Sequence, residues 1–403
     1  MIITDLGMNG EGIAHDQGRT HFVPYALVGE NVECIFDRYI VSKSSPDRVE
    51  PKCPYFEKCG GCVLQHLAYE KELVFKSQLV SRTIKKIAGL DVECLHTKTA
   101  DEYHYRNKIA LPVGSINGEY KVGMYARSSH NLVAITDCVI TKPFAKNVIS
   151  LSNDFLHNTN AKDIRYIVAR ESENGLVLTI VATRNIKNVN YLTNKLQTKF
   201  DNFALYLCIN KNPKTILNDN LTLLSGDKHL PKPDSFAQVN DQVSEMLYNN
   251  VLSEIDAKDI VIDAYSGAGK MTMMFAKVAH HVYGIEIVQN AVNQANELMV
   301  KNNISNVTNI CGDCAKVLPD LIKKQTGKTT IVLDPPRAGC DAKVLNAIIS
   351  ARVDKIVYVS CNPKTLARDL KLLADCYDIK YIQPYNMFPR TEHVESLVVL
   401  ERK

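Results

Sequence analysis

Residues 260–269 read Ile-Val-Ile-Asp-Ala-Tyr-Ser-Gly-Ala-Gly, and the prediction of the fold starts from them. A short β-branched run ends near the carboxylate of Asp263, a glycine-containing turn follows, and residues 271–276 continue as an apolar helical segment. Glycines allow the backbone to approach a ligand closely where a helix begins. The third glycine of a dinucleotide-binding fingerprint is absent, because Thr272 stands three residues beyond Gly269. The stretch predicts a strand, a ligand-binding turn and a helix.

The same alternation of strand-like and helical segments continues to the end of the sequence. Short apolar runs at residues 282–285, 330–333 and 355–359 alternate with helical segments. Near-continuous β-branched strands separated by helices are typical of a mostly parallel sheet that is covered on both faces. Residues 236–403 are therefore predicted to form an α/β domain, and its ligands should bind at the carboxyl ends of the strands.

Polar residues stand where the predicted strands end. Glu286 lies 23 residues after Asp263, where a carboxylate can accept hydrogen bonds from the ribose hydroxyls of an adenosine group. With the glycine fingerprint incomplete, this carboxylate favours S-adenosylmethionine over NAD, because a sulfonium needs no cradle for a pyrophosphate. Asp334 follows the run at 330–333, and the two prolines after it stiffen the chain and present a rigid acceptor.

A thiol follows the run at 355–359. Cys361 stands there in the sequence Ser-Cys-Asn-Pro, beside the edge expected to hold the cofactor. Near the C-terminus, residues 387–395 bring acidic side chains back toward the same edge, which makes Glu395 a candidate base. His393 is better interpreted as an orienting or packing residue. A nucleophilic thiol reacts as the thiolate, so we expect the site to lower the pKa of Cys361.

Length and composition limit the number of domains and the class of protein. The 403 residues suffice for two or three domains. No run of about 18 apolar residues and no basic, apolar leader occurs, so we expect a cytoplasmic protein that does not span a membrane. Residues 51–235 carry 25 Lys and Arg against 17 Asp and Glu, a surplus that weakly favours a polyanionic partner.

The chain before residue 236 is predicted to contain two further parts. The first 50 residues have short β-like runs punctuated by glycine, which predict a small barrel. In the following part, Leu73, Val80, Ile84 and Ile87 form the apolar stripe of a helix. Mixed strands and helices then extend to about residue 235.

The twelve cysteines are interpreted as thiols, metal ligands or catalytic groups rather than as disulfides, because a reducing compartment is expected. Cys53, Cys59 and Cys62 form a C-x5-C-x2-C loop, and Cys138 follows in the same part of the chain. Three clustered thiolates and a distant fourth can hold either a tetrahedral zinc ion or a four-iron cluster. The spacing alone does not separate these two.

Together these motifs resemble those of the RNA 5-methyluridine methyltransferases, a family that acts on uracil C5 in ribosomal or transfer RNA. The likeness covers essentially the whole chain. The stretches that carry it are residues 235–240, 263–269, 334–339, 360–369 and 388–395. The resemblance implies a class I, Rossmann-like methyltransferase domain at 236–403, a mixed α/β central domain at 51–235 and an OB-like β-barrel, the TRAM module, at 1–50.

The resemblance also implies roles for individual residues. Cys361 would add to uracil C6, C5 would take the methyl group from S-adenosylmethionine, and Glu395 would remove the C5 proton. The residues that would line the cofactor are Gln238, Tyr265, Glu286, Asp313 and Asp334. By the same likeness, Cys53, Cys59, Cys62 and Cys138 would hold a [4Fe-4S] cluster rather than zinc.

The expected substrate is a uridine in 23S ribosomal RNA, because the bacterial transfer-RNA branch of the family generally lacks both the barrel and the cluster. Transfer RNA is the alternative substrate. Cytosine-C5 methylation is less favoured, since it predicts a Pro-Cys nucleophile where this chain has Arg337. The non-enzyme alternative is an RNA-binding scaffold held together by a metal cluster. We expect a monomer.

Overall fold

The computed structural model describes residues 1–36, 38–235 and 237–403, so Phe236 of the motif at 235–240 lies outside the described residues. The described chain divides into two compact units. The first unit comprises Met1–Tyr69, Asp101–Asp241 and Pro389–Glu392, and the second comprises Glu70–Ala100, Gln242–Phe388 and His393–Lys403. A helix long and apolar enough to cross a bilayer does not occur among the described residues. The predicted division into three domains stays a prediction.

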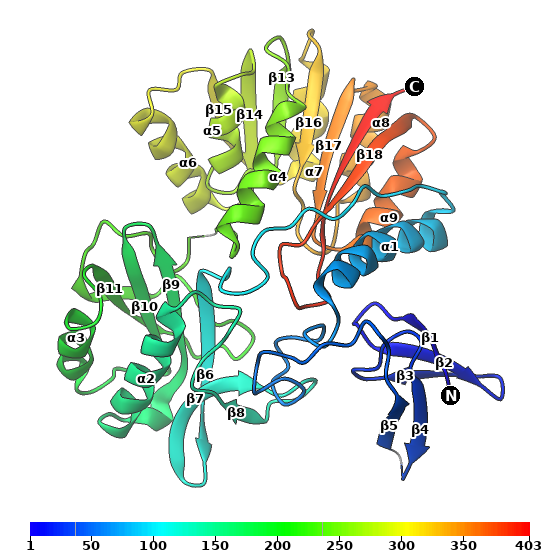
Figure 1. Ribbon diagram of the computed structural model, residues 1–403. Helices are drawn as coiled ribbons and strands as arrows, with labels where there is room; N and C mark the ends of the chain where they lie inside the picture. Colours follow the sequence, from blue (N-terminus) through cyan, green and yellow to red (C-terminus); the bar gives the residue numbers. More distant parts are fainter. Residues whose placement is uncertain (37, 236) are drawn as a thin grey trace. The chain divides into compact units, whose positions relative to one another are not determined.

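The second unit is built on a sheet with the strand order β15-β14-β13-β16-β17-β19-β18 (Figure 1). Its strands are β13 (Ile260–Ala264), β14 (His281–Glu286), β15 (Val307–Cys311), β16 (Thr329–Leu333), β17 (Lys355–Ser360), β18 (Tyr377–Tyr385) and β19 (Glu395–Arg402). Strands β13 to β17 are parallel, and β19 runs antiparallel to both β17 and β18. The predicted mostly parallel α/β sheet is confirmed. Its order reverses between β13 and β16, and ligands bind at such a point in open α/β sheets.

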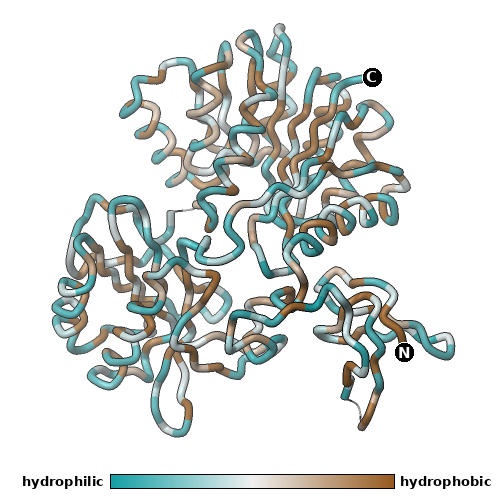
Figure 2. Tube along the Cα trace, viewed as in Figure 1, coloured by the Kyte–Doolittle hydropathy of each residue, from teal (hydrophilic) through white to brown (hydrophobic). Residues whose placement is uncertain are grey.

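The helices around this sheet bury their apolar side chains. They are α1 (Tyr69–Ala88), α4 (Asp241–Ser253), α5 (Lys270–Ala276), α6 (Gln289–Lys301), α7 (Cys314–Lys323), α8 (Ala342–Ala351) and α9 (Pro363–Leu373). Leu247 of α4 and Phe275 of α5 pack in one core with strand residues such as Val332. All five residues of β16 are buried, as expected for a central parallel strand covered on both faces. Figure 2 shows the hydrophobic colour running along β16, β17 and β19.

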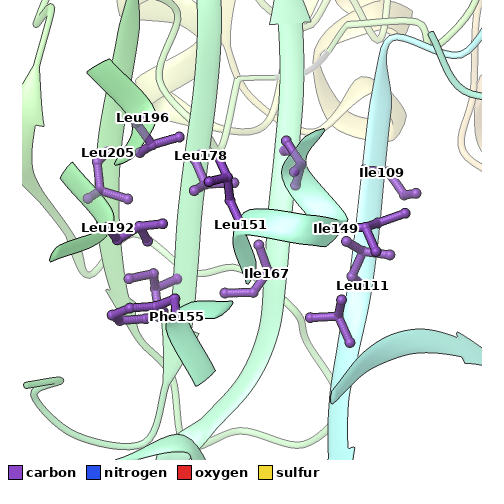
Figure 3. Close-up of a cluster of buried hydrophobic side chains, with 14 of the residues drawn as sticks. Ile109, Leu111, Ile149, Leu151, Phe155, Ile167, Leu178, Leu192, Leu196 and Leu205 are labelled. Carbon is purple, nitrogen blue, oxygen red and sulfur yellow. The ribbon is translucent and has the colours of Figure 1, made fainter. Parts of the chain in front are cut away.

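The first unit contains another mixed sheet, with the order β12-β11-β10-β9-β6-β7-β8. Its strands are β6 (Lys108–Ile116), β7 (Glu119–Tyr125), β8 (Leu132–Ala134), β9 (Ile164–Ser172), β10 (Gly175–Ala182), β11 (Phe203–Ile209) and β12 (Leu221–Gly226). Helices α2 (Phe144–His157) and α3 (Val189–Gln197) share a buried core with this sheet. Figure 3 shows Leu151 and Phe155 of α2 among Ile167 of β9, Leu178 of β10 and Leu192 of α3. This is the mixed α/β arrangement that the sequence predicts.

The N-terminal residues form small antiparallel sheets within the first unit. The strands are β1 (Ile3–Leu6), β2 (Gly12–Asp16), β3 (Arg19–Val23), β4 (Asn31–Ile35) and β5 (Arg38–Lys43). The first three pair in order, and β4 pairs with β5. A bridge between Ile2 and Asn31 joins the two sheets, and Ile3, Val23 and Val32 share a core. This arrangement, here called the N-terminal β-module, fits the small barrel predicted for the first 50 residues.

Candidate active site

The turn after β13 contains residues in the left-handed region of backbone space. Tyr265, Gly267 and Gly269 have φ angles of 69°, 55° and 80°, and α5 begins at Lys270. A Cβ atom on Gly269 would lie 2.8 Å from the Cβ of Ala295 in α6, so helix packing also requires this glycine. A Cβ on Gly267 would meet nothing within 4 Å among the described residues. Gly267 is therefore the position where a ligand can approach the backbone.

Asp263 and Thr272 join β13 to α5 behind this turn. The Asp263 side chain is fully buried, and its Oδ2 accepts a 2.6 Å hydrogen bond from the Thr272 hydroxyl. Burial raises the pKa of the Asp263 carboxyl to about 7, and the carboxylates of Asp334 and Glu286 add to the increase. In the sequence, Thr272 stands where the third glycine of a dinucleotide-binding fingerprint would be. Its bond to Asp263 was missed because two residues nine positions apart, on a strand and a helix, share no local pattern.

Glu286 and Asp313 lie at the ends of the neighbouring strands. The Glu286 carboxylate accepts hydrogen bonds from the backbone N–H groups of Gly267 at 3.1 Å and Val288 at 2.8 Å. Asp313 caps α7, because its Oδ1 accepts a 3.0 Å bond from the N–H of Ala315. Each carboxylate oxygen can accept more than one hydrogen bond, so both side chains keep capacity for a ligand. These two of the predicted cofactor residues therefore lie along the same carboxyl edge.

The other predicted cofactor residues lie in different surroundings. Burial raises the pKa of the Tyr265 phenol, whose side chain also hydrogen-bonds with the Cys340 thiol. Asp334 follows β16 at the same edge of the sheet as Glu286. Gln238 belongs to the first unit, where its carbonyl accepts a 3.0 Å bond from the Asn107 amide. Its relation to the other cofactor residues stays a prediction.

Strands β17 and β19 bring a thiol and a carboxyl group to one edge of the sheet. Cys361 follows the last residue of β17, and Glu395 is the first residue of β19. The antiparallel register pairs Ser360 with Ser396, so Cys361 and Glu395 come next to each other just beyond the ladder. The Glu395 side chain is buried, with 4% of the residue exposed, whereas Cys361 is partly exposed. A ligand at this edge can therefore reach the thiol beside a buried carboxyl.

The charges at this edge act on one another. Burial raises the pKa of the Cys361 thiol, and the carboxylates of Glu395 and Asp334 raise it further, while the Arg337 guanidinium opposes them. Burial also raises the pKa of Glu395 to about 8 and that of Asp334 to about 7. The expectation that these side chains lower the pKa of Cys361 is wrong. Burial and the two carboxyl groups outweigh the one exposed arginine.

The Asn362 side chain joins the start of α9 to the Asp-Pro-Pro-Arg loop. Its amide oxygen accepts a 3.1 Å bond from the N–H of Lys364 and caps the helix. Its amide nitrogen donates a 3.0 Å bond to the carbonyl of Arg337. The Asn-Pro turn after Cys361 thus fixes the loop that carries Asp334 and Arg337.

Asp369 of α9 holds the far end of the same loop. Its buried carboxylate accepts hydrogen bonds from the N–H of Cys340 at 2.9 Å and from the Tyr358 hydroxyl at 2.6 Å. The Arg368 guanidinium binds the same carboxylate at 2.7 Å. Asp369 lies in the motif at residues 360–369, but no role could be predicted for it because its partners come from β17 and from the loop after β16.

The four predicted metal ligands line one cavity in the first unit. Cys53, Cys59, Cys62 and Cys138 surround a volume of about 100 Å³, and none of the described cysteines forms a disulfide. Burial raises the pKa values of the Cys53, Cys59 and Cys62 thiols, and neighbouring thiols of the set add to the increase. In the described part of the chain, no three His, Cys, Asp or Glu side chains are close enough to hold a single metal ion. The thiols therefore share a cavity but do not form a compact site for one ion.

Comparison with known proteins gives a consistent assignment. The profile of the tRNA (uracil-5-)-methyltransferase family matches residues 68–403. An RNA methyltransferase of Clostridium tetani is 34% identical, over 99% of this chain and 95% of that protein. A second, from Listeria innocua, is 33% identical, over 100% of this chain and 97% of that protein.

A solved structure also matches the whole chain. The tRNA (uracil-54, C5)-methyltransferase of Pyrococcus abyssi, in complex with S-adenosyl-L-homocysteine, is 26% identical with a TM-score of 0.78. The similarity covers 99% of this chain and 98% of that one. The chain belongs to the tRNA (uracil-5-)-methyltransferase family and is an S-adenosylmethionine-dependent RNA (uracil-C5)-methyltransferase.

Proposed function

We propose that this enzyme methylates C5 of a specific uridine in 23S ribosomal RNA through a covalent adduct between Cys361 and uracil C6. The observation that carries the proposal is the pairing of β17 with β19, which brings Cys361 and Glu395 to one edge of the sheet. The raising effect of the Glu395 carboxylate on the pKa of Cys361 supports this placement. A uridine stacked in RNA would have to leave its stack to reach this edge.

The chemistry follows from the low reactivity of uracil C5. The Cys361 thiolate forms a bond to C6, and the electron pair of the C5–C6 double bond moves toward the C4 carbonyl as an enolate. S-adenosylmethionine supplies the methyl group that C5 then takes, and S-adenosylhomocysteine is released. Glu395 removes the C5 proton, the double bond forms again, and Cys361 leaves as a thiolate.

The environment of Glu395 suits a base at this step. Burial raises its pKa to about 8, so near neutral pH it is in part ionised and can take a proton from carbon. The Arg337 guanidinium favours the ionised form, whereas the Asp334 carboxylate opposes it. Because their pKa values are raised, Glu395 and Asp334 are partly protonated near neutral pH. They therefore place less negative charge beside the Cys361 thiolate than two fully ionised carboxylates would.

We propose that Gln238, Tyr265, Glu286, Asp313 and Asp334 line the S-adenosylmethionine site. Glu286 supports this best, because backbone N–H groups hold its carboxylate in place and its remaining capacity can accept ribose hydroxyls. The Pyrococcus abyssi enzyme, which is similar over the whole chain, was solved with S-adenosyl-L-homocysteine.

Ribosomal RNA is proposed as the substrate, and transfer RNA is the alternative. The N-terminal β-module and the four-cysteine set support the first, whereas the names of the family and of the Pyrococcus abyssi enzyme favour the second. Mass mapping of 5-methyluridine in both RNA classes, from a strain lacking this chain, tests the proposal. We expect one or more 23S positions to lose the methyl group. Loss from transfer RNA alone would contradict the proposal.

We propose that Cys53, Cys59, Cys62 and Cys138 hold a [4Fe-4S] cluster. The donors fit, because four thiols line one cavity and thiolates are the usual ligands of such clusters. A tetrahedral zinc site with Zn–S bonds of about 2.3 Å needs its sulfurs in close contact. A [4Fe-4S] cluster instead binds each of its four thiolates through a separate iron.

Protein purified without oxygen should be brown and contain about four iron atoms and four sulfides per chain. Metal analysis and the visible absorption spectrum check this result. A Cys138→Ser variant should lose the colour, whereas Cys34→Ser, which changes an exposed thiol outside the cavity, should keep it. Colourless protein with about one zinc per chain would contradict the assignment.

The proposal also covers the domains, the oligomeric state and the location of the enzyme. Residues 1–50 would act as a TRAM-like RNA-binding module, residues 51–235 as the cluster-bearing central domain and residues 236–403 as the methyltransferase domain. A monomeric state and a cytoplasmic location are also proposed. The first 50 residues contain 4 Lys and Arg against 8 Asp and Glu, so RNA contacts there would depend on shape more than on charge.

A further inference from the structure

The segment just before Glu395 changes units twice. The chain leaves the second unit after Phe388, belongs to the first unit at Pro389–Glu392, and returns to the second unit at His393. Residues 389–392 are here called the strap. Glu395 follows the strap by three residues and begins β19. The position of the proposed base therefore depends on how this short segment is held.

The chain just before the strap is fixed by buried polar groups of α1. The Lys76 ammonium donates to the Asn386 side chain at 2.5 Å and to the carbonyl of Phe388 at 3.1 Å. Lys76 is paired with Glu72 at 3.1 Å, and both side chains are fully buried. The Asn386 amide donates to the same Glu72 carboxylate at 2.9 Å. Residues 386–388 thus have a defined position within the second unit.

The strap itself is held by backbone bonds from residues that directly follow Cys62. The N–H groups of Val63 and Leu64 donate to the carbonyl of Arg390 at 3.0 and 3.1 Å. The buried Tyr105 hydroxyl donates a 3.0 Å bond to the carbonyl of Pro389. Two consecutive carbonyls of the strap are therefore bound inside the first unit.

The Arg390 side chain adds a second set of contacts. It is 4% exposed, donates to the carbonyl of Leu67 at 2.7 Å and forms an ion pair with Glu102. Its guanidinium lies 4.8 Å from the ring centre of Tyr69 and 5.4 Å from that of Tyr103, so it also makes cation–π contacts. The planar fork of arginine suits this geometry, which the single ammonium of lysine cannot reproduce.

We propose that Arg390 is a positioning residue, which holds the strap so that Glu395 is placed for proton removal. The inference rests on the proposed role of Glu395 as the base. Arg390 does not touch the reacting atoms in this scheme. Its loss should slow the proton-removal step more than the preceding addition of Cys361, because the thiol lies on β17 and not on the strap.

Two variants test the inference in the full-length enzyme. Tyr105→Phe removes one hydrogen bond to the strap without changing the ring, and Arg390→Lys keeps the charge but loses the fork. The matched control is Tyr377→Phe, because the Tyr377 hydroxyl is also buried and donates to a backbone carbonyl, that of Ile348, at 3.2 Å. The RNA adduct is measured on denaturing gels in single-turnover reactions, together with product formation.

We expect both strap variants to form the adduct at close to the wild-type rate and to break it down more slowly. The expected delay is about tenfold for Tyr105→Phe and up to about a hundredfold for Arg390→Lys, since small displacements of a catalytic group have effects of this size. Hydrogen exchange at the Val63 and Leu64 amides should also become faster in the strap variants. The control should match the wild type in every measurement.

The outcomes separate the inference from the function on which it rests. If Glu395→Gln accumulates adduct and the strap variants do not, the inference about Arg390 is wrong while the base assignment stands. Equal slowing of adduct formation and breakdown would also overturn it, because a general loss of structure has that signature. If Glu395→Gln itself fails to accumulate adduct, the base assignment and the inference fail together.

Discussion

Replacement of Cys361 by serine should reduce methyl transfer by about a thousandfold or more, as expected when a covalent nucleophile is lost. The hydroxyl occupies nearly the same space at the end of β17, so the fold and the Asn362 cap should persist. A serine hydroxyl is a far weaker nucleophile than a thiolate toward uracil C6. Transfer of a labelled methyl group from S-adenosylmethionine to RNA gives the rate, and denaturing gels show whether any protein–RNA adduct forms.

The control for this variant is Cys376→Ser, which changes a partly exposed thiol outside the edge where β17 and β19 meet. That variant should keep the wild-type rate. If Cys361→Ser retained a tenth of the activity, the covalent mechanism would be excluded, although the enzyme could still be a methyltransferase.

Replacement of Glu395 by glutamine should stop turnover and make the covalent adduct accumulate. Addition of the thiol and transfer of the methyl group both precede proton removal, so the reaction should halt at the methylated adduct. The change also removes a carboxylate that raises the pKa of Cys361. The thiolate should therefore form at lower pH, and adduct formation should not be slowed.

Adduct yield and product yield, measured in the same samples at several pH values, check this prediction. Glu401→Gln is the matched control, because Glu401 lies on the same strand near its other end and pairs there with Lys380 at 3.3 Å. A Glu395→Gln enzyme that loses adduct and product in parallel would show that Glu395 has another role.

Much of the methyltransferase sheet could be predicted from the sequence, because its strands are local runs of β-branched residues. The runs at 260–262, 330–333 and 355–359 all lie within strands of the sheet. The polar residues after them reach one edge, since parallel strands end on the same side. The proximity of Cys361 and Glu395 could not be derived in this way, because it depends on the pairing of β19 with β17.

Burial of charged side chains could not be predicted from the local sequence pattern. The apolar stripe of α1 correctly marked Leu73, Val80 and Ile84 as buried, whereas Ile87 is 37% exposed. Glu72 and Lys76 stand four residues apart, a spacing typical of a solvated surface pair, yet both are fully buried. Their partner Asn386 is more than 300 positions away along the chain. A pattern confined to one helix cannot reveal such a contact.

The sign of the pKa shift at Cys361 was wrong for a similar reason. The prediction followed from what a nucleophile needs, whereas the pKa of Cys361 depends on burial and on which charges the fold places nearby. Asp334 and Glu395 are far apart in sequence, and both act on the thiol in the folded enzyme. The same non-local arrangement gives Glu395 its raised pKa.

The place of β19 has a consequence for how the enzyme is made. This strand follows β17 and β18 in the sequence, yet it is inserted between them in the sheet. Until residues 395–402 have been synthesised and can pair, β17 and β18 each present an unpaired edge, which is a known route to aggregation. A chain truncated before residue 395 should therefore be insoluble rather than a partly active enzyme.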